Sequence, residues 1–433
     1  MTNRKFIAFF GTFILLGSAS AQVPDLLNAF DSGARSQGAG GALNGAAADT
    51  YSTVYNPAGL GYVNRPTLQL GQRNLPSTRT AVGGTFNEQN RTATRRNGST
   101  SFVHFGYAIP GSAIRKGEKG SFGVSYSITG LVDDLATAAG DLTFAPGIRV
   151  RDFTETKRVR TDFLSFGYGR TNAAGNLAVG YGIVFANQSL TFRQTGSLVD
   201  GNGDPISGGP AVISFPNVKS RTSGVGLTAG VQYSPPNNPN ASFNASVRSP
   251  IRVGGGGSGV NFSTIPGRLM LGAALRYEGY RKGKDDYLVV GANTQFFFGG
   301  QGSSDFERGS QGGFGLGLEY NLDFGRTRVP LRLGYQTIGS SGTGYDSYQT
   351  LTYGIGYQPG DGRYTIDFSY ARPRSGGQDT YITATYRFYH ANSSCSWLFD
   401  SGNGWTRPSM EGQLRAWFDL GEGQRLVGGA DGL

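Results

Sequence analysis

Residues 177–185 have the sequence LAVGYGIVF, in which large apolar residues alternate with small ones. The large residues are Leu177, Val179, Tyr181, Ile183 and Phe185. A period of two places successive side chains on opposite faces of a β-strand, so this strand has one apolar face and one face of small residues. In a membrane barrel the apolar face contacts lipid, whereas in a soluble sandwich it faces the core. Alternation alone does not separate these two classes.

The same alternation recurs along the chain, for example in 120–130, 310–324 and 363–373. Three features favour the membrane barrel: strands of about 9 to 14 residues, a large number of strands, and Tyr and Phe near the strand ends. We therefore predict an all-β fold, a transmembrane antiparallel β-barrel of about fourteen strands. The predicted strands are 67–86, 100–109, 120–130, 160–170, 176–194, 220–234, 241–251, 267–278, 286–299, 310–324, 329–338, 348–358, 363–373 and 379–388.

An even strand number places both barrel ends on the periplasmic side. Residues 67–86 are then one strand with an irregularity at 74–77. The connections assigned to the outside, such as 131–159 and 195–219, are mostly long, and those on the other side are mostly short. This asymmetry is typical of outer-membrane barrels.

The N-terminus has the features of a secretion signal. Arg4 and Lys5 precede an apolar run at 6–16, and small residues follow at 18–21. The apolar run is too short to span a bilayer as a helix, so we expect residues 1–21 to be removed and Gln22 to begin the mature chain. The cleavage site contains no cysteine, which argues against a lipid anchor.

Between the signal and the first strand, residues 31–60 have the sequence DSGARSQGAGGALNGAAADTYSTVYNPAGL. Its small residues permit tight turns and close packing, and Asn56-Pro57 favours a turn. A flexible linker with a turn has the same composition. The stretch resembles the mature N-terminus of FadL-type outer-membrane transporters, with the Asn-Pro-Ala motif at Asn56, Pro57 and Ala58. The resemblance implies a hatch at 22–66 folded inside the lumen of a barrel that comprises 67–388.

The resemblance also implies passive transport of a hydrophobic small molecule, such as a long-chain fatty acid or a hydrocarbon, without a cofactor. Leu26, Leu27 and Phe30 are candidate ligand contacts at the mature N-terminus, and the Asn-Pro-Ala motif would hold the hatch. Packing against the barrel wall accounts for each of these residues equally well. Burial of an apolar ligand supplies on the order of 0.8 kcal/mol per methylene, so binding needs no specific polar contact.

Two outer connections carry further predictions. Leu135 and Phe144 lie in an apolar stretch, 131–153, that could form a short helix or a hairpin over the barrel mouth and contact an apolar ligand. The alternative is that these residues pack against 195–219. Residues 200–204 resemble half of a calcium loop but lack the glutamate at the twelfth position, so we predict a turn and no metal site.

Composition excludes several functions. One cysteine, Cys395, permits no intramolecular disulfide. The net charge of +10 becomes +8 without Arg4 and Lys5, and the basic residues are scattered, so nucleic acid is not an expected partner. With two histidines, His104 and His390, no metal cluster or Ser-His-Asp arrangement can be assembled. We predict no catalytic residue, no metal and no enzyme activity.

Charged residues within the strands are expected to face the lumen. We predict this for Asp162, Glu319 and Asp367, with arginines as neutralising partners. The candidate partners are Arg332, Arg276 and Arg170.

The last strand ends at Phe388, as the resemblance implies for barrel insertion, yet the chain continues through 389–433. All three tryptophans and Cys395 lie in this tail, and 409–420 could form a short amphipathic helix. A periplasmic contact segment and an extension without a selected role are both open.

Three functions are compatible with these features, all at the outer membrane and with a monomer expected. The first is transport of a hydrophobic compound. The second is a barrel without a small-molecule substrate that serves secretion machinery as a shuttle for exported proteins. The sequence at 55–60 is also similar to that of the barrel that works with type-nine secretion machinery. The third is a structural, porin-like protein.

Overall fold

The structure is a computed structural model of the chain. It describes residues 33–46, 48–75, 78–86, 89–97, 100–111, 118–138, 142–145, 148–205, 213–214, 218–253, 264–279, 284–299, 311–339, 348–373 and 379–388. The predicted signal, residues 22–32 and the tail lie outside these ranges.

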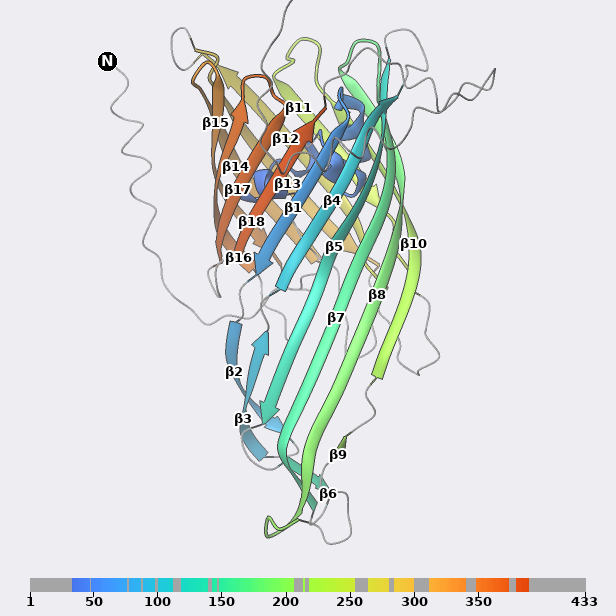
Figure 1. Cartoon of the computed structure of the whole chain (residues 1–433), viewed down its shortest axis with the longest axis vertical. Coiled ribbons are helices and arrows are strands. Elements are labelled where there is room, and N and C mark those ends of the chain that lie inside the picture. The colour runs from blue at the N-terminus through green and yellow to red at the C-terminus, as the bar shows by residue number, and fades with distance from the viewer. Residues whose placement is uncertain are drawn as a thin grey trace, which may run out of the picture. The chain divides into compact units, whose positions relative to one another are not determined.

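Fourteen of the described strands form a closed antiparallel barrel, as predicted (Figure 1). The wall strands, in order around the barrel, are β1 (Thr67–Leu75), β4 (Thr100–Gly111), β5 (Lys119–Ala138), β7 (Ile148–Thr171), β8 (Leu177–Asp200), β10 (Val218–Tyr233), β11 (Ala241–Arg248), β12 (Gly267–Glu278), β13 (Tyr287–Phe298), β14 (Gln311–Asp323), β15 (Thr327–Ile338), β16 (Tyr348–Pro359), β17 (Tyr364–Pro373) and β18 (Asp379–Arg387). The barrel closes where β1 pairs with β18, from Thr67 opposite Arg387 to Asn74 opposite Thr380. Each wall strand therefore pairs with a neighbour on both sides, and the ring has no free edge strand.

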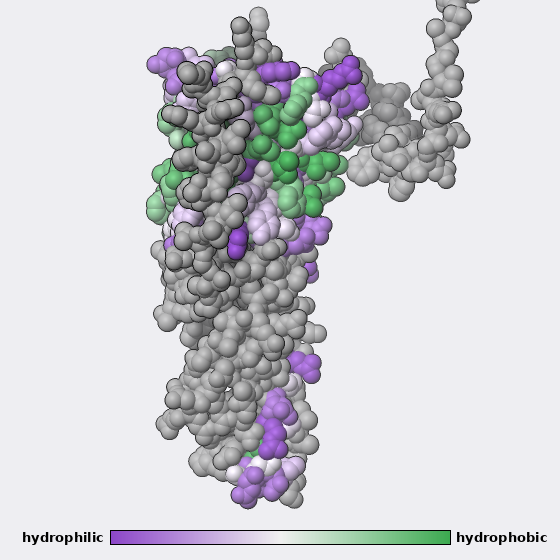
Figure 2. All heavy atoms as spheres, turned by 90° about the vertical axis from the view of Figure 1, so that its left-hand side faces the viewer, coloured by the Kyte–Doolittle hydropathy of each residue, from purple (hydrophilic) through white to green (hydrophobic). Residues whose placement is uncertain are grey.

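The outer face of the wall is apolar and the inner face is polar or small. Tyr181 on β8 is 64% exposed and Leu227 on β10 is 63% exposed, whereas Ala178 and Thr228 on the same two strands are buried at 0% and 3%. Figure 2 shows hydrophobic residues gathered on the barrel wall, with hydrophilic residues at the rim beside them. Because large apolar residues point away from the lumen, the wall suits a lipid surrounding rather than water.

The prediction of a single strand over 67–86 is wrong. β1 ends at Leu75, and β2 (Thr78–Phe86) leaves the wall to pair with β3 (Gln89–Asn97). The sequence contains Pro76 at the break, and a proline has no amide hydrogen to donate to a strand ladder. β3 in turn pairs with the outer end of β5, so the hairpin extends the sheet beyond the barrel.

Most of the predicted loop at 131–159 is strand, and within 195–219 the described strands cover 195–200, 213–214 and 218–219. β5 and β7 remain paired as far as Thr137 opposite Thr154, and β8 continues to Asp200. Two short strands, β6 (Leu142–Ala145) and β9 (Ile213–Ser214), also belong to this extension: β6 lies near its tip, and β9 pairs with β8 (Figure 1). Asp133 lies opposite Arg158 in this ladder.

The lumen contains residues 33–63, which we call the lumenal segment. It comprises α1 (Gly33–Gly38) and three 3-10 turns, η2 (Asn44–Ala46), η3 (Thr50–Thr53) and η4 (Pro57–Tyr62). In Figure 1 these short helices, in blue, lie within the ring of strands. Within the described ranges, the chain forms no helix with both the length and the apolar character needed to cross a bilayer.

Candidate functional site: the segment that fills the lumen

Glycines on both sides allow the lumenal segment to touch the wall backbone. A Cβ atom added to Gly38 would lie 2.9 Å from Cα of Gly354 on β16. Cβ atoms added to Gly317 or Gly334 would collide with the backbone of Ala39. The small-residue run therefore serves close backbone contact, for which only hydrogen in place of a side chain leaves room.

An ion-pair network holds α1 against β14, β15 and β17. Arg35 donates through Nε and a terminal nitrogen to the two oxygens of Glu319, both at 2.9 Å. Arg332 donates from Nε to the same carboxylate at 2.6 Å, and its Nη1 lies 2.8 Å from Oδ1 of Asp367. Arg332 and Glu319 are each 2% exposed at the side chain, whereas Arg35 is 47% exposed. The wall carboxylate is thus buried between two guanidinium groups, one of which belongs to the lumenal segment.

A second polar contact follows along the same helix. Nε2 of Gln37 donates to Asp379 at 2.7 Å, and Oε1 of Gln37 accepts from Ser369 at 2.6 Å. Arg73 forms an ion pair with Asp379 at 2.6 Å. Since Gln37 is 0% exposed, both ends of its amide are satisfied by wall side chains rather than by water.

The turn η3 contacts the adjoining part of the wall, from β18 and β1 to β4, β5 and β7. Thr50 lies 3.0 Å from Nε2 of His104, and the ring of Tyr51 stacks on the imidazole with centroids 3.7 Å apart. The Tyr51 hydroxyl is 2.6 Å from the hydroxyl of Tyr381. Burial raises the pKa of the Tyr51 phenol well above its usual value, so Tyr51 stays neutral at physiological pH. His104 was predicted to be a lumen or girdle residue, and it faces the lumen.

Arg268 on β12 contacts the end of η3, and Arg248 lies opposite it on β11. Arg268 donates to the carbonyl oxygens of Val54 and Tyr55 at 2.6 and 3.1 Å, and its guanidinium lies 4.4 Å from the Tyr55 ring centroid. Arg248 donates to the Pro266 carbonyl at 2.8 Å. A cation at carbonyls that end a helical turn is favourable, because those oxygens carry partial negative charge.

The Asn-Pro-Ala motif begins η4 and joins it to the rest of the segment. Oδ1 of Asn56 accepts the amide of Ala58 at 3.2 Å, and Nδ2 donates to the Gly45 carbonyl at 3.0 Å and to Val231 of β10 at 3.4 Å. Pro57 occupies the start of the turn, where its missing amide hydrogen leaves no bond unmade. The motif is therefore an N-cap that also bonds to the wall.

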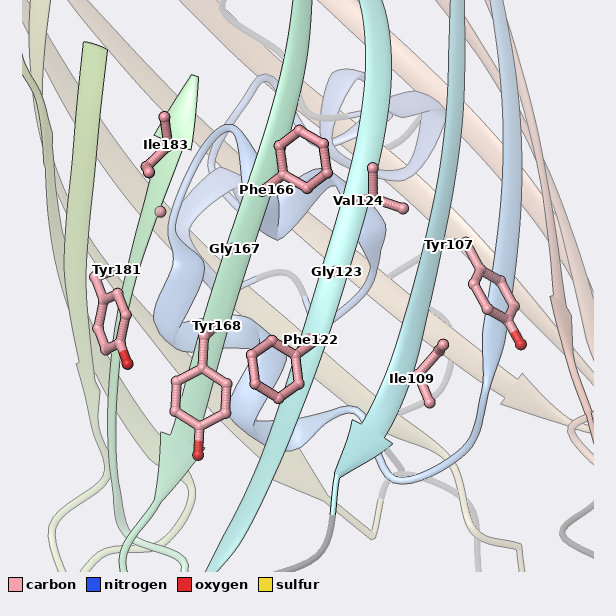
Figure 3. Close-up of a pocket in the computed structure, with 11 residues that line it drawn as sticks. Tyr107, Ile109, Phe122, Gly123, Val124, Phe166, Gly167, Tyr168, Tyr181 and Ile183 are labelled. Atoms are coloured by element: carbon pink, nitrogen blue, oxygen red, sulfur yellow. The ribbon is translucent and has the colours of Figure 1, made fainter. Parts of the chain in front are cut away.

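On the lipid side of the wall, β4, β5, β7 and β8 form an apolar groove of about 330 Å³. Its side-chain lining includes Tyr107, Phe122, Phe166, Tyr168, Tyr181 and Ile183 (Figure 3). Figure 3 shows the three tyrosine hydroxyls pointing toward the same end of the barrel, with the lumenal segment behind the strands. Added Cβ atoms on Gly123 and Gly167 would lie 2.9 and 3.0 Å from Leu60 of η4. Only glycine backbone separates the groove from the lumenal segment at these points.

Beside this groove the β4–β5 ladder is short. It runs from Gly111 opposite Gly120 to His104 opposite Ser127, whereas β4 pairs with β1 as far as Thr100. β5 continues to pair with β7 through a register shift between Ile128 and Gly130. In the last pair of this ladder, Nδ1 of His104 lies 2.7 Å from the Ser127 hydroxyl. Because His104 also contacts η3, the end of the ladder is a contact site of that turn.

The fold is similar to those of several solved structures. A FadL homologue of Pseudomonas aeruginosa superposes with a TM-score of 0.54 at 13% identity, covering 86% of this chain and 100% of that chain. The P. putida toluene transporter TodX gives 0.55 at 15% identity, covering 83% and 99%. The CymD monoaromatic hydrocarbon channel gives 0.51 at 13% identity, covering 84% and 99%.

The chain has the FadL-type fold. At these identities the likeness concerns the fold alone. No family model matches the sequence. No curated protein matches it either.

Within this FadL-type barrel, the predicted motif residues Asn56, Pro57 and Ala58 are buried and close together. Leu26, Leu27 and Phe30 lie outside the described residues. Leu135 and Phe144 lie on the extended strands β5 and β6, and the structure describes their backbone only. Their contact with a ligand stays a prediction.

Two predicted lumen carboxylates are confirmed and one is wrong. Glu319 and Asp367 face the lumen with Arg332 as their partner, as expected. Asp162 instead lies between the buried Thr161 and Phe163 and points outward, where Arg160 contacts it at 2.7 Å. Arg170 and Arg276 have other carboxylate partners, Glu118 and Glu278.

Residues 200–204 form the predicted turn. Asp200 accepts the amides of Asn202 and Asp204 at 2.8 and 2.9 Å, which occupies the carboxylate with backbone bonds. In the described part of the chain, His, Cys, Asp and Glu side chains form no group of three that could hold a metal ion.

Proposed function

We propose that this FadL-type barrel is an outer-membrane channel for passive passage of hydrophobic small molecules, either fatty acids or hydrocarbons, and that the lumenal segment is its hatch. One observation carries the proposal: a segment of the chain lies inside a barrel with an apolar outer face and makes polar contacts with the wall. The similar solved structures, which are named as a FadL homologue and as hydrocarbon channels, support the same reading.

A comparison of free energies favours a hatch that an apolar ligand can displace. Each hydrogen bond between the segment and the wall contributes about 1 kcal/mol net, because water replaces the lost partner when the segment moves. Burial of ten methylenes supplies about 8 kcal/mol. A bound chain of that length therefore offsets the loss of several contacts at Gln37, Thr50 or Asn56 without any energy source.

We propose that ligand reaches the membrane or the periplasm when the hatch moves away from β4, β5 and β7. Two features support this location: the glycine backbone between the lipid-side groove and Leu60, and the short β4–β5 ladder that ends at His104. Gly123 and Gly167 contact Leu60 of η4, and His104 contacts Thr50 of η3. Displacement of these turns would therefore expose the inner side of the wall at β4, β5 and β7.

A disulfide lock tests the proposal. The hydroxyls of Thr53 and Ser125 are in hydrogen-bond contact between η3 and β5, so Thr53→Cys with Ser125→Cys places two sulfurs at bonding distance. In a Cys395→Ala background, we expect the oxidised double variant to lose uptake of radiolabelled oleate and radiolabelled toluene, and reduction to restore it. Each single cysteine variant is the matched control. Equal uptake of both compounds in the oxidised and reduced forms would refute the gating role.

The secretion shuttle is the second candidate, and the extension of β5, β7 and β8 beyond the apolar wall favours it, because it offers sheet surface to a protein. In that case neither compound is taken up by the wild type. Exported proteins would then co-purify with the barrel and dissociate when the β2–β3 hairpin is deleted.

A further inference from the structure

The outer face of β7, β8 and β10 has an arrangement of cations that the transport proposal does not use. Ser189 on β8 is paired with Arg160 on β7 and with Arg221 on β10. One rung further out, Thr191 is paired with Arg158 and Lys219. Directly paired residues in antiparallel strands share a face, so each hydroxyl residue lies between two basic positions.

These rungs lie on the outer side of the sheet. Arg221 is exposed while the next residue, Thr222, is buried toward the lumen. On β8 the same face carries Tyr181, Ile183 and Phe185, which are exposed, and it continues through Ser189 to the exposed Arg193. The basic positions therefore continue the lipid-facing side of the wall rather than the lumen.

The position of these rungs along the barrel axis matches one interface of a membrane. Arg170 and Arg160 are ten positions apart on the outward face of β7. At about 3.3 Å per residue and a tilt of about 40°, this separation is about 25 Å along the barrel axis, the usual height of the apolar band. Arg170 lies at the end where β1 begins and β18 finishes, which is periplasmic in barrels of this kind. Arg160 and Arg221 are then at the outer-leaflet interface.

The charge on this face is only partly neutralised. Its described basic side chains are Arg160, Arg193 and Arg221. The described acidic side chain among them is Asp162, which contacts Arg160 at 2.7 Å. Three positive charges and one negative charge leave a net charge of +2 (3 − 1) among these side chains. At the outer ends of β12 and β13 the outward residues are instead Leu269, Phe296 and Phe298.

We propose that this face binds the phosphate groups of lipid A, the lipid anchor of lipopolysaccharide in the outer leaflet. Two neighbouring strand spacings put Arg160 and Arg221 about 10 Å apart across Ser189, so both guanidinium groups can reach a phosphate placed over the serine. Arginine donates in a fork that suits phosphate oxygens, and the hydroxyl adds a donor. The acyl chains of the same lipid lie on the apolar residues immediately below, such as Phe185 and Val225. The inference is independent of what passes through the lumen.

Native mass spectrometry of the purified full chain with added lipid A tests this site. The variant combines Arg193→Gln, Lys219→Gln and Arg221→Gln. We expect it to bind lipid A about 100-fold more weakly than wild type, since each basic residue near an anionic lipid surface contributes about 1 kcal/mol. The matched control also removes three exposed arginine charges, but at the other end of the barrel: Arg170→Gln, Arg276→Gln and Arg326→Gln. It should bind like wild type.

Folding of each variant is checked by the heat-dependent shift in gel mobility of the barrel. If the triple variant does not fold, Arg221→Gln alone should weaken binding about fivefold. Dephosphorylated lipid A should bind at least as weakly to wild type as lipid A binds to the triple variant. The proposal is overturned if dephosphorylated lipid A or phosphatidylglycerol binds wild type as tightly as lipid A does, or if the control variant loses affinity equally.

Discussion

Replacing Glu319 with glutamine should loosen α1 from the wall of the barrel. The carboxylate accepts two hydrogen bonds from Arg35, one from Arg332 and one from Asn321. Removing one member of a buried ion pair usually costs about 3 to 5 kcal/mol. Here the cost is smaller, because Arg332 keeps Asp367 beside it and Arg35 is 47% exposed and can be hydrated. We expect the free energy needed to detach α1 from the wall to fall by about 2.5 kcal/mol, which raises the equilibrium constant for detachment about 60-fold.

Hydrogen exchange followed by mass spectrometry measures this opening directly. The amides of Ala39, Gly40 and Gly41 are bonded to carbonyls of α1 at 2.8 to 3.1 Å, so they exchange only when the helix opens. Protection of these amides should fall about 60-fold in Glu319→Gln, while the amides of β14 stay protected. The matched control is Glu278→Gln, which removes a carboxylate that is 57% exposed and paired with Arg276. Unchanged protection in Glu319→Gln, or an equal fall in the control, would refute the assignment of this network as the anchor of α1.

Three further substitutions test the rest of the lumenal segment by the same exchange measurement. Gly334→Val should displace residues 38–41, because its side chain would collide with the backbone of Ala39 and Gly40, whereas Gly201→Ala, with open space around it, should have no effect. Asn56→Ala should lower the protection of η4 by about 1 to 2 kcal/mol, since it loses the cap and the bonds to Gly45 and Val231; normal protection would show that the motif is not an anchor. Leu60→Ala should cost about 2 to 5 kcal/mol, because Leu60 is 0% exposed between Gly123 and Gly167, and a smaller loss would mean that the lumen collapses around the site.

The barrel wall was predictable because each strand carries its own signal. Along β8 the alternation of large and small residues appears again as alternation of exposed and buried side chains. Position in the strand decides this pattern, so no knowledge of distant partners is needed. The strand ends were harder to predict: polar residues such as those at 154–160 alternate in type without an apolar face, and the sequence alone did not distinguish paired strands from loops there.

The sequence predicted that the lumenal segment packs closely, but not which wall residues it contacts. Its glycines and alanines indicated close packing, but the surfaces they touch, such as Gly334 and Gly354, are about 300 positions away in sequence. The same holds for Arg35, whose partner Glu319 lies 284 residues further along. Glu319 and Arg332 were expected to face the lumen together, yet no feature of residues 33–63 identified Arg35 as the third member. Asp162 was assigned to the wrong face because a charged residue in a strand was taken to avoid lipid, whereas its height places it near the interface with Arg160.

The lumenal segment is attached in two chemically different ways, and the difference bears on gating. Around α1 the contacts are charged and buried: Arg332 and Glu319 are each 2% exposed, so moving α1 leaves charge in a poorly hydrated site. Apart from Arg268, which donates to the carbonyls at the end of η3, the contacts described around η3 and η4 are made by neutral groups such as Thr53, Asn56 and Leu60. Separating each of these neutral groups from the wall costs less than separating an ion pair. A ligand with limited binding energy would therefore displace η3 and η4 first, while α1 keeps the segment attached. These are also the turns that lie behind the lipid-side groove and beside the short β4–β5 ladder. Exchange measured with ligand bound should accordingly rise in 50–62 before it rises in 33–41, and the reverse order would place the moving part at α1.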